Sequence, residues 1–180
     1  MKAAFLLTDT EGNASNEMAA GATAIACIVR RSGSSRYVYT ANCGDARAVL
    51  CHDGRAVRLS KDHKAGDSEE VNRIAAAGGF VVRGRVMGVL AVARSFGDYV
   101  LKDYVTAEPF TSTTRIDTTC QFLIAACDGL WDVIDDQEAV DMIREYATSE
   151  TKQRSAGKHL VSAALERGST DNITVMVVWL

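Results

Sequence analysis

Short apolar runs separated by turn signals occupy the first third of the chain. Residues 22–29 (A-T-A-I-A-C-I-V) and 37–42 (Y-V-Y-T-A-N) flank a polar segment that contains glycine, a pattern typical of a buried strand, a turn and a second strand. Residues 48–51 and 56–59 stand on either side of H-D-G, and Asp-Gly between two extended runs favours a hairpin. The pattern therefore predicts a meander of antiparallel strands.

Helical periodicity, with a polar residue at each start, occurs later in the chain. Two of the expected helices begin with capping-box spacing, from Asp67 to Glu70 and from Asp135 to Glu138. Glycines at 78–79 end the first of them, and a further helix spans about residues 156–167. The side chains expected to face the core are Val71, Ile74, Ala139, Ile143, Ala147, Leu160, Val161, Ala164 and Leu165.

The remaining apolar runs complete a mixed architecture. Residues 121–127 (Q-F-L-I-A-A-C) form the most hydrophobic strand candidate, residues 173–179 form another buried strand, and a short strand is expected at 80–82. The glycine-spaced residues 83–98 carry no clear structural prediction. Because no repeat, low-complexity tract or linker interrupts the chain, we expect one α+β domain over residues 1–180, with mostly antiparallel sheet.

Composition and charge exclude several classes of partner. The chain has 180 residues, of which 47% are hydrophobic and 24% charged, and these are ordinary globular values. Its 20 Lys and Arg residues stand against 23 Asp and Glu residues, so no basic excess favours nucleic acid or an anionic membrane. No apolar run approaches the roughly 20 residues needed to span a bilayer. We therefore expect neither a nucleic-acid partner nor a membrane partner.

The cysteines indicate a reducing environment. Their number is odd, none belongs to a C-x-x-C pair, and most stand within apolar runs. This usage favours reduced, buried thiols in a cytoplasmic or nuclear protein over disulfides or zinc ligands. The cysteines are Cys27, Cys43, Cys51, Cys120 and Cys127. Cys127 is distinctive because it precedes an Asp-Gly turn.

Several expected strands stop at an aspartate in a tight turn, and these aspartates are candidate metal ligands. They are Asp45 in G-D, Asp128 in D-G and Asp171 in D-N, and a helical turn would place Asp132 beside Asp128. Converging carboxylates repel one another unless a cation lies between them, and Mg²⁺ and Mn²⁺ prefer such oxygen ligands. The alternative is that each aspartate only forms a turn or a helix cap. The residues alone leave both interpretations open.

Other candidate chemistry is weaker. His63, in the sequence K-D-H-K, is a candidate general acid, but a loop histidine among charged residues is more typical of a solvated surface position. The glycine-spaced run that contains Gly84, Gly88 and Gly97 has neither G-x-G-x-x-G nor a P-loop lysine, so it does not support nucleotide binding.

Taken in order, the motifs of this chain resemble the catalytic domain of the type 2C metal-dependent protein serine/threonine phosphatases. The likeness extends from about residue 21 to the C-terminus. The segments that carry it are G-A-T-A at 21–24, A-N-C-G-D-A-R at 41–47, L-S-K-D-H-K at 59–64, residues 70–79, L-A-V-A-R-S-F-G-D at 90–98, A-E-P at 107–109, A-C-D-G-L-W-D-V at 126–133 and G-S-T-D-N-I-T-V at 168–175.

The resemblance implies a fold, a metal centre and a reaction. The fold is a sandwich of two mostly antiparallel β-sheets flanked by α-helices. The centre holds two Mg²⁺ or Mn²⁺ ions, for which Asp128 and Asp171 are the matching ligands, while Asp45 and Asp132 match residues associated with a third, weaker metal. A metal-activated water attacks the phosphorus of phosphoserine or phosphothreonine, so the implied substrates are phosphoproteins.

Part of the family pattern has no counterpart among these 180 residues. The family's D-G-H-G-G motif, its phosphate-binding arginine, its M-E-D glutamate and its general-acid histidine are not found, so no catalytic side chain is assigned. Residues 1–20 resemble the helix that follows D-G-H-G-G. We therefore expect an N-terminally incomplete domain with unpaired sheet edges, which hydrolyses phosphoesters poorly or not at all. The alternative is a non-catalytic pseudophosphatase that serves as a binding or regulatory module; the oligomeric state stays open.

Overall fold

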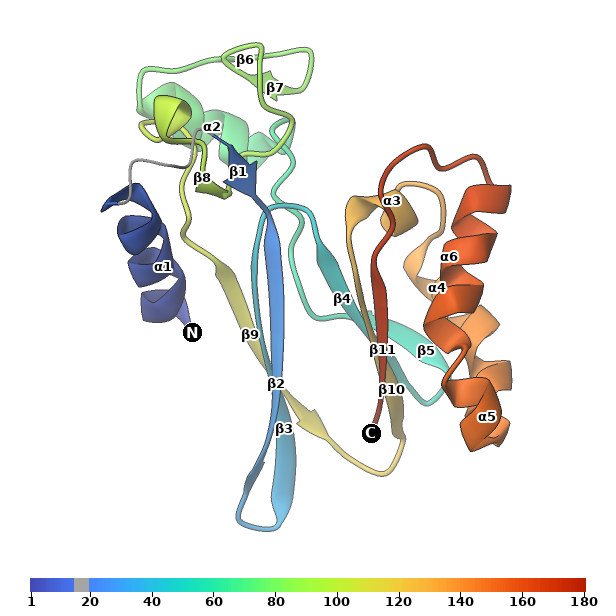
Figure 1. The fold of residues 1–180 in the computed structure, drawn as a ribbon. Helices are drawn as coiled ribbons and strands as arrows, with labels where there is room; N and C mark the ends of the chain where they lie inside the picture. The colour runs from blue at the N-terminus through green and yellow to red at the C-terminus, as the bar shows by residue number, and fades with distance from the viewer. Residues whose placement is uncertain (15–19) are drawn as a thin grey trace. The chain divides into compact units, whose positions relative to one another are not determined.

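The computed structural model describes residues 1–14 and 20–180 (Figure 1), and the expected helix over residues 1–20 therefore extends in part beyond the described residues. Two compact units divide the chain. Unit 1 contains Met1–Ala26, Ala41–Asp45 and Lys61–Thr111, and unit 2 contains Cys27–Thr40, Ala46–Ser60 and Ser112–Leu180. No helix in the described ranges has the length and apolar content that a membrane crossing requires.

A four-stranded sheet, in the order β11-β10-β4-β5, is the centre of unit 2. All of its pairings are antiparallel, and Leu123 lies opposite Leu50 on one side and Val178 on the other. Asp53 and Gly54 join β4 to β5 with positive φ angles of 50° and 72°, which fits the tight turn of a hairpin. The predicted hairpin is confirmed. The strands are β4 (Arg47–His52), β5 (Arg55–Arg58), β10 (Cys120–Ala126) and β11 (Val175–Trp179).

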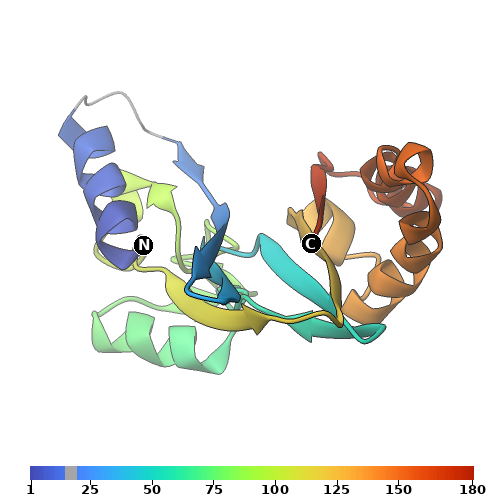
Figure 2. The same ribbon diagram turned by 90° about the horizontal axis from the view of Figure 1, so that it is seen from below.

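Helices pack on this sheet and close the core of unit 2. Figure 2 shows them, coloured orange to red, on one side of the strands near the C-terminus. They are α3 (Asp128–Trp131), α4 (Asp136–Arg144), η2 (Glu145–Thr148), α5 (Glu150–Gln153) and α6 (Ala156–Glu166). Phe122, Ile143 and Leu160 are fully buried in the cluster between sheet and helices. One expectation is wrong: Leu165 is 57% exposed, and Ala163 takes the core-facing position on α6.

Unit 1 is built from short elements around smaller clusters. They are α1 (Lys2–Ala14), β1 (Gly21–Ala22), α2 (Ser68–Ala76), β6 (Val81–Val82), β7 (Arg85–Val86), β8 (Phe96–Gly97) and η1 (Tyr99–Leu101). The Phe5 ring of α1 packs against Phe96, with centroids 5.1 Å apart. An Asp9 carboxylate oxygen accepts hydrogen bonds from the Gly97 amide at 2.8 Å and from Lys102 Nζ at 3.0 Å, which ties α1 to β8.

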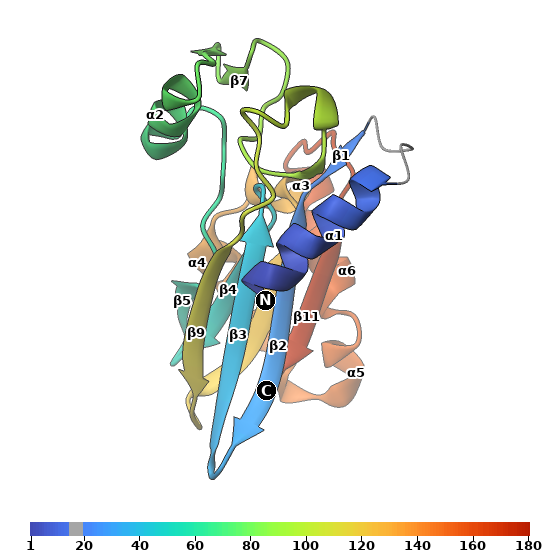
Figure 3. The ribbon, with the colours of Figure 1, turned by 90° about the vertical axis from the view of Figure 1, so that its left-hand side faces the viewer.

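A second sheet, in the order β2-β3-β9, contains residues of both units (Figure 3). Its strands are β2 (Ala24–Ser32), β3 (Ser35–Cys43) and β9 (Phe110–Ile116). The prediction that residues 22–29 and 173–179 are buried strands is wrong in part, because Ile28, Val29 and Met176 are 46%, 41% and 62% exposed. Both strands are at the edge of their sheet order, and apolar composition alone does not report whether another element covers a strand.

Candidate metal centre

Asp128 and Asp132 are one turn apart on a short helix at the end of β10. β10 ends at Ala126, and the amide of Asp132 donates a hydrogen bond to the carbonyl of Asp128 at 2.8 Å. The buried Trp131 side chain anchors the turn, because its Nε1 donates to the Ala126 carbonyl at 3.0 Å. The predicted helical turn that brings these two aspartates together is confirmed, and the apolar residues of D-G-L-W-D are what fix it to the core.

Gly129 brings the Asp171 loop against the start of α3. A Cβ atom at this position would lie 2.3 Å from the carbonyl oxygen of Asn172, so only glycine permits this approach of the two backbones. Ser169 Oγ donates to the Gly129 carbonyl at 2.7 Å, and the Cys127 amide donates to the Thr174 carbonyl at 3.3 Å. The loops that carry Asp128 and Asp171 are thus in direct backbone contact within unit 2.

The donor chemistry at these loops fits a hard divalent cation. Asp128 is half-buried, Asp132 and Asp171 are exposed, and the Asp128 carboxylate has no hydrogen-bond or ion-pair partner among the residues that the structure describes. Carboxylate oxygens facing water are the ligands that Mg²⁺ and Mn²⁺ prefer, since these ions keep several waters. The three carboxylates do not form a group whose ligand atoms all lie within 4.8 Å of one another. A cation here would therefore need further ligands or bridging waters.

The arginine that begins β4 packs against the short helix α3. Arg47 NH1 bonds to Asp136 Oδ1 at 2.6 Å, and its guanidinium lies over the Trp131 ring, 5.1 Å from the centroid. Arg58 Nε donates to the other Asp136 oxygen at 2.7 Å. Burial by itself would raise the pKa of Asp136, but the hydrogen bonds from Arg58 and Arg47 outweigh it and hold the pKa below its usual value. Arg47 therefore supports the short helix that carries the two aspartates.

Asp45 belongs to unit 1 and is held in a tight turn after β3. Its side chain is 7% exposed, and Lys64 Nζ lies 3.4 Å from one carboxylate oxygen. Gly44 before it has a φ of +96°, and a Cβ there would lie 2.3 Å from the methyl carbon of Thr23. The G-A-T-A and G-D segments thus meet inside unit 1, and the sequence reasoning did not foresee the lysine partner of Asp45.

His63 is buried rather than solvated, so the prediction of a surface histidine is wrong. Its Nδ1 lies 3.2 Å from the amide nitrogen and 3.0 Å from the carbonyl oxygen of Gly44, and the His63 amide donates to the same carbonyl at 3.0 Å. Burial, followed by the nearby charge of Arg94, lowers the pKa of His63 to about 4. A side chain that is neutral near pH 7 and fully buried holds the G-D turn in place. The charged residues beside His63 in the sequence concealed this burial.

An ion-pair network around Glu70 was missed by sequence reasoning. Glu70, 1% exposed, accepts hydrogen bonds from Arg73 Nε at 2.8 Å and from Arg94 at 2.8 and 2.5 Å. Burial alone would raise the pKa of Glu70, but these arginines outweigh it and hold the pKa below its usual value. Arg73 also bonds to the carbonyls of Tyr104 and Ala93, both at 2.9 Å.

The network corrects the expected capping box of α2. Asp67 caps the helix by accepting from the Glu69 amide at 2.9 Å, while the Glu70 side chain points to the arginines instead of closing the box. In α4 the predicted cap is confirmed, since Asp135 accepts from the Glu138 amide at 2.8 Å. Such a cap contributes about 1 kcal/mol. The sequence spacing of polar residues predicts both helix caps, by Asp67 and by Asp135. The burial of the Glu70 side chain depends instead on residues distant in sequence.

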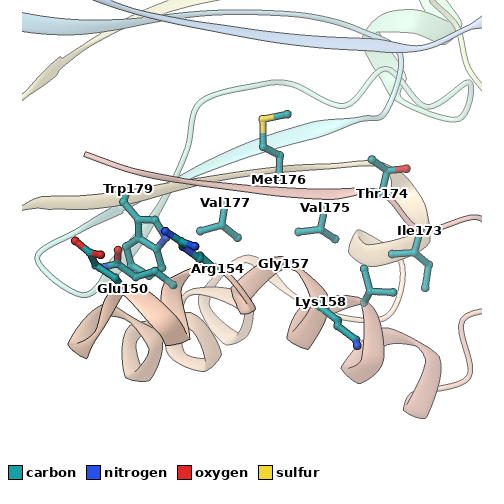
Figure 4. A pocket seen from close by; sticks show the side chains of 12 residues that line it. Glu150, Arg154, Gly157, Lys158, Ile173, Thr174, Val175, Met176, Val177 and Trp179 are labelled. Carbon is teal, nitrogen blue, oxygen red and sulfur yellow. The ribbon is translucent and has the colours of Figure 1, made fainter.

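A groove in unit 2 runs beside β11, along α5 and α6, with a volume of about 880 Å³. Figure 4 shows Val175 and Val177 directed toward the helices and Met176 directed away from them. Glu150 and Arg154 line the groove near Trp179, and α6 contributes Lys158. The carboxylates of Asp128 and Asp171 do not line this groove, so it is separate from the candidate metal centre.

Comparison with known proteins decides the family. The family model described as "Protein phosphatase 2C" matches residues 1–173 of the chain. The chain belongs to the protein phosphatase 2C family. Over 161 residues it is 51% identical to "Protein phosphatase 2C homolog 1" of Schizosaccharomyces pombe, an alignment that covers 88% of this chain and 45% of that protein.

Solved structures confirm the fold. A sex-determining protein of C. elegans superposes with a TM-score of 0.88 at 25% identity, covering 99% of this chain and 45% of that one. Serine-threonine phosphatase 2C from Toxoplasma gondii superposes with a TM-score of 0.81 at 23% identity, covering 97% of this chain and 64% of that one. The α+β fold expected of a protein phosphatase 2C is thus confirmed, and the chain spans about half the length of the fission yeast relative.

Proposed function

We propose that this chain provides part of the site at which a protein phosphatase 2C hydrolyses phosphoserine and phosphothreonine in phosphoproteins, with Mg²⁺ or Mn²⁺ as the cofactor. The observation that carries the proposal is the backbone contact at Gly129, which holds the Asp128 and Asp171 loops together at one end of the sheet. The family is metal-dependent, and the carboxylates at this place are donors suited to these two cations.

The proposal gives each aspartate a binding role. Asp128 and Asp171 would hold the paired cations, and Asp132 of unit 2 would bind the third, weaker one. A binding role for Asp45, in unit 1, rests on the family resemblance alone. When bound, the cations supply charge stabilisation for the phosphoryl group and activation of the attacking water. The protein's own contribution is to keep the carboxylates in place: Trp131 and Arg47 fix α3, and Gly129 fixes the distance between the loops.

We also propose that the 180 residues alone turn over phosphoesters slowly or not at all. They contain no D-G-H-G-G motif, to which the family resemblance assigns further metal ligands and the general acid. The three carboxylates of unit 2 do not make a compact ligand group by themselves, which agrees with a ligand set that needs additional members. Loss of metal ligands lowers activity more than loss of a supporting contact does.

Hydrolysis of p-nitrophenyl phosphate with and without Mn²⁺ tests both statements. We expect at most slow, Mn²⁺-dependent turnover that Asp128→Asn removes. Asp53→Asn is the matched control, because it changes the other Asp-Gly turn of the chain, at a φ of 50° that asparagine tolerates. Robust turnover by the wild type would overturn the expectation of weak activity. Turnover that survives Asp128→Asn would overturn the assignment of Asp128, and full Mn²⁺ binding without turnover would favour the non-catalytic module.

A further inference from the structure

A separate group of potential metal ligands lies at the opposite end of β10 from Asp128. His52, Asp117 and Cys120 each offer one ligand atom, and these atoms all lie within 4.8 Å of one another. In the described part of the chain this is the one group of at least three histidine, cysteine or acidic side chains with that property. β10 has seven residues, so at about 3.4 Å per residue the group is about 20 Å from the Asp128 end.

The sheet register brings these residues together. His52, the last residue of β4, is the antiparallel partner of Cys120, the first residue of β10, so both side chains leave the same face of the sheet. Asp117 is in the turn that leads into β10, and its carbonyl accepts a hydrogen bond from the Cys120 amide at 3.3 Å. Because the histidine and the cysteine come from paired strands, their approach does not depend on a mobile loop.

The separations of these atoms are compatible with metal coordination, and the Cys120 thiol donates one weak hydrogen bond to Asp117 Oδ1, which a metal–sulfur bond would replace. His52 Nε2 lies 3.6 Å from Asp117 Oδ2, and Cys120 Sγ lies 3.7 Å from Asp117 Oδ1. A hydrogen bond between nitrogen and oxygen would be about 2.9 Å long. Ligand atoms at about 2.0–2.3 Å from a tetrahedral zinc ion lie about 3.3–3.5 Å from one another. The Asp117 Oδ1 atom is also fixed by the Thr119 amide at 2.9 Å and the Thr119 hydroxyl at 2.5 Å.

We propose that His52, Asp117 and Cys120 bind a zinc-like divalent cation through one nitrogen, one oxygen and one sulfur atom, with water in the fourth position. A borderline-soft ion is favoured because thiolate and imidazole select zinc over Mg²⁺ and Mn²⁺. On binding, a metal–sulfur bond forms and the Cys120 thiol proton passes to the buffer. The side chains of His52 and Asp117 are 46% and 51% exposed, which leaves a path for the ion.

This proposal departs from what cysteine spacing indicates. The chain has no C-x-x-C pair, and its cysteine usage favours buried, reduced thiols over zinc ligands. Cys120 is indeed buried. Pairing between strands gives it a histidine, and the turn just before β10 gives it a carboxylate. The ligands come from β4, from the turn before β10 and from β10 itself, so a bound ion would join three segments at this end of the sheet.

Cobalt spectroscopy on the 180-residue protein tests the site. Co²⁺ added to protein freed of metal by a chelator should give a near-ultraviolet thiolate-to-cobalt charge-transfer band, and Zn²⁺ should remove the band while excess Mg²⁺ should not. Cys120→Ser should abolish the band, and His52→Gln should weaken Zn²⁺ affinity by at least about tenfold. Cys27→Ser and Asp128→Asn should keep the band, because neither residue belongs to the group.

The outcomes separate this site from the proposed phosphatase centre. A band that is absent in the wild type, or that persists in Cys120→Ser, would overturn the proposal. Loss of the band in Asp128→Asn would also overturn it, because the cobalt would then lie at the other end of β10. If Cys120→Ser does not fold, the half-exposed His52 still decides the matter: unchanged Zn²⁺ affinity in a folded His52→Gln variant would contradict the assignment.

Discussion

Replacing Gly129 by alanine should separate the two aspartate loops. The added Cβ would lie 2.3 Å from the carbonyl oxygen of Asn172 and 3.2 Å from Cγ1 of Ile173, whereas ordinary contacts begin at 3.4 Å. The backbone segments must therefore move apart by about 1 Å, because the nearest atom belongs to the main chain and cannot rotate away. Overpacking of this kind costs about 1–3 kcal/mol of the free energy of unfolding.

The same movement should weaken metal binding. It displaces Asp128 relative to Asp171 and strains the hydrogen bond from Ser169 to the Gly129 carbonyl. Loss of support around metal ligands lowers affinity by about 10–100-fold, and we expect a loss in that range for Mn²⁺. Urea denaturation followed by tryptophan fluorescence measures stability, and isothermal titration calorimetry measures the Mn²⁺ affinity.

Gly66→Ala is the control for these measurements. Its Cβ would have no neighbour closer than 3.9 Å, and Gly66 is not among the glycines with a positive φ. We expect its stability to change by less than about 0.5 kcal/mol and its Mn²⁺ affinity to be unchanged. If Gly129→Ala were as stable as Gly66→Ala and bound Mn²⁺ as well as the wild type, the loop contact would not be what organises the aspartates.

Further predictions concern the buried charges and the buried histidine. Burial lowers the pKa of His63 in the folded protein from 6.5 to about 4, so between these pH values the unfolded chain binds a proton at His63 that the folded protein does not. The free energy of unfolding should therefore fall by about 3 kcal/mol as the pH drops from 6.5 to about 4. Urea denaturation of His63→Gln should not show this pH-dependent loss. Glu70→Gln leaves guanidinium groups without their carboxylate partner and should cost about 3 kcal/mol; a thermal midpoint equal to that of the wild type would contradict this. Arg47→Ala should destabilise the protein more than Arg58→Ala, because the Arg47 side chain is 10% exposed and the Arg58 side chain is 44% exposed. Arg58→Ala should cost less than about 1 kcal/mol of the free energy of unfolding. Equal denaturation midpoints for the two variants would refute this ranking.

Much of the local structure could be predicted from sequence because its causes are local. The Asp53-Gly54 hairpin follows from two residues that accept positive φ angles. The cap of α4 by Asp135 follows from the position of one polar side chain before an apolar stripe. The D-G-L-W-D turn also follows from short-range pattern, since helical spacing alone brings Asp128 beside Asp132.

The remaining features depend on which segments meet in space. Residues 173–179 and 22–29 have the composition of buried strands, yet Met176 and Ile28 are exposed. Composition does not show which element, if any, covers a strand. His63 has charged neighbours in sequence but is enclosed by the G-D turn. Glu70 has capping-box spacing, but arginines from its own helix and from a distant loop determine its conformation. Long-range pairing of this kind has no signature in a single sequence.

The central claim is that Asp128 and Asp171 build one metal site, and a double-mutant cycle for Mn²⁺ binding tests it most directly. Calorimetric affinities would be measured for Asp128→Asn, for Asp171→Asn and for the double variant, with Asp53→Asn as the control. If the two carboxylates act on the same ions, each single variant loses at least about tenfold in affinity and the double variant loses little more than the weaker-binding single one. Losses that simply multiply, or single variants that bind like Asp53→Asn, would contradict the claim.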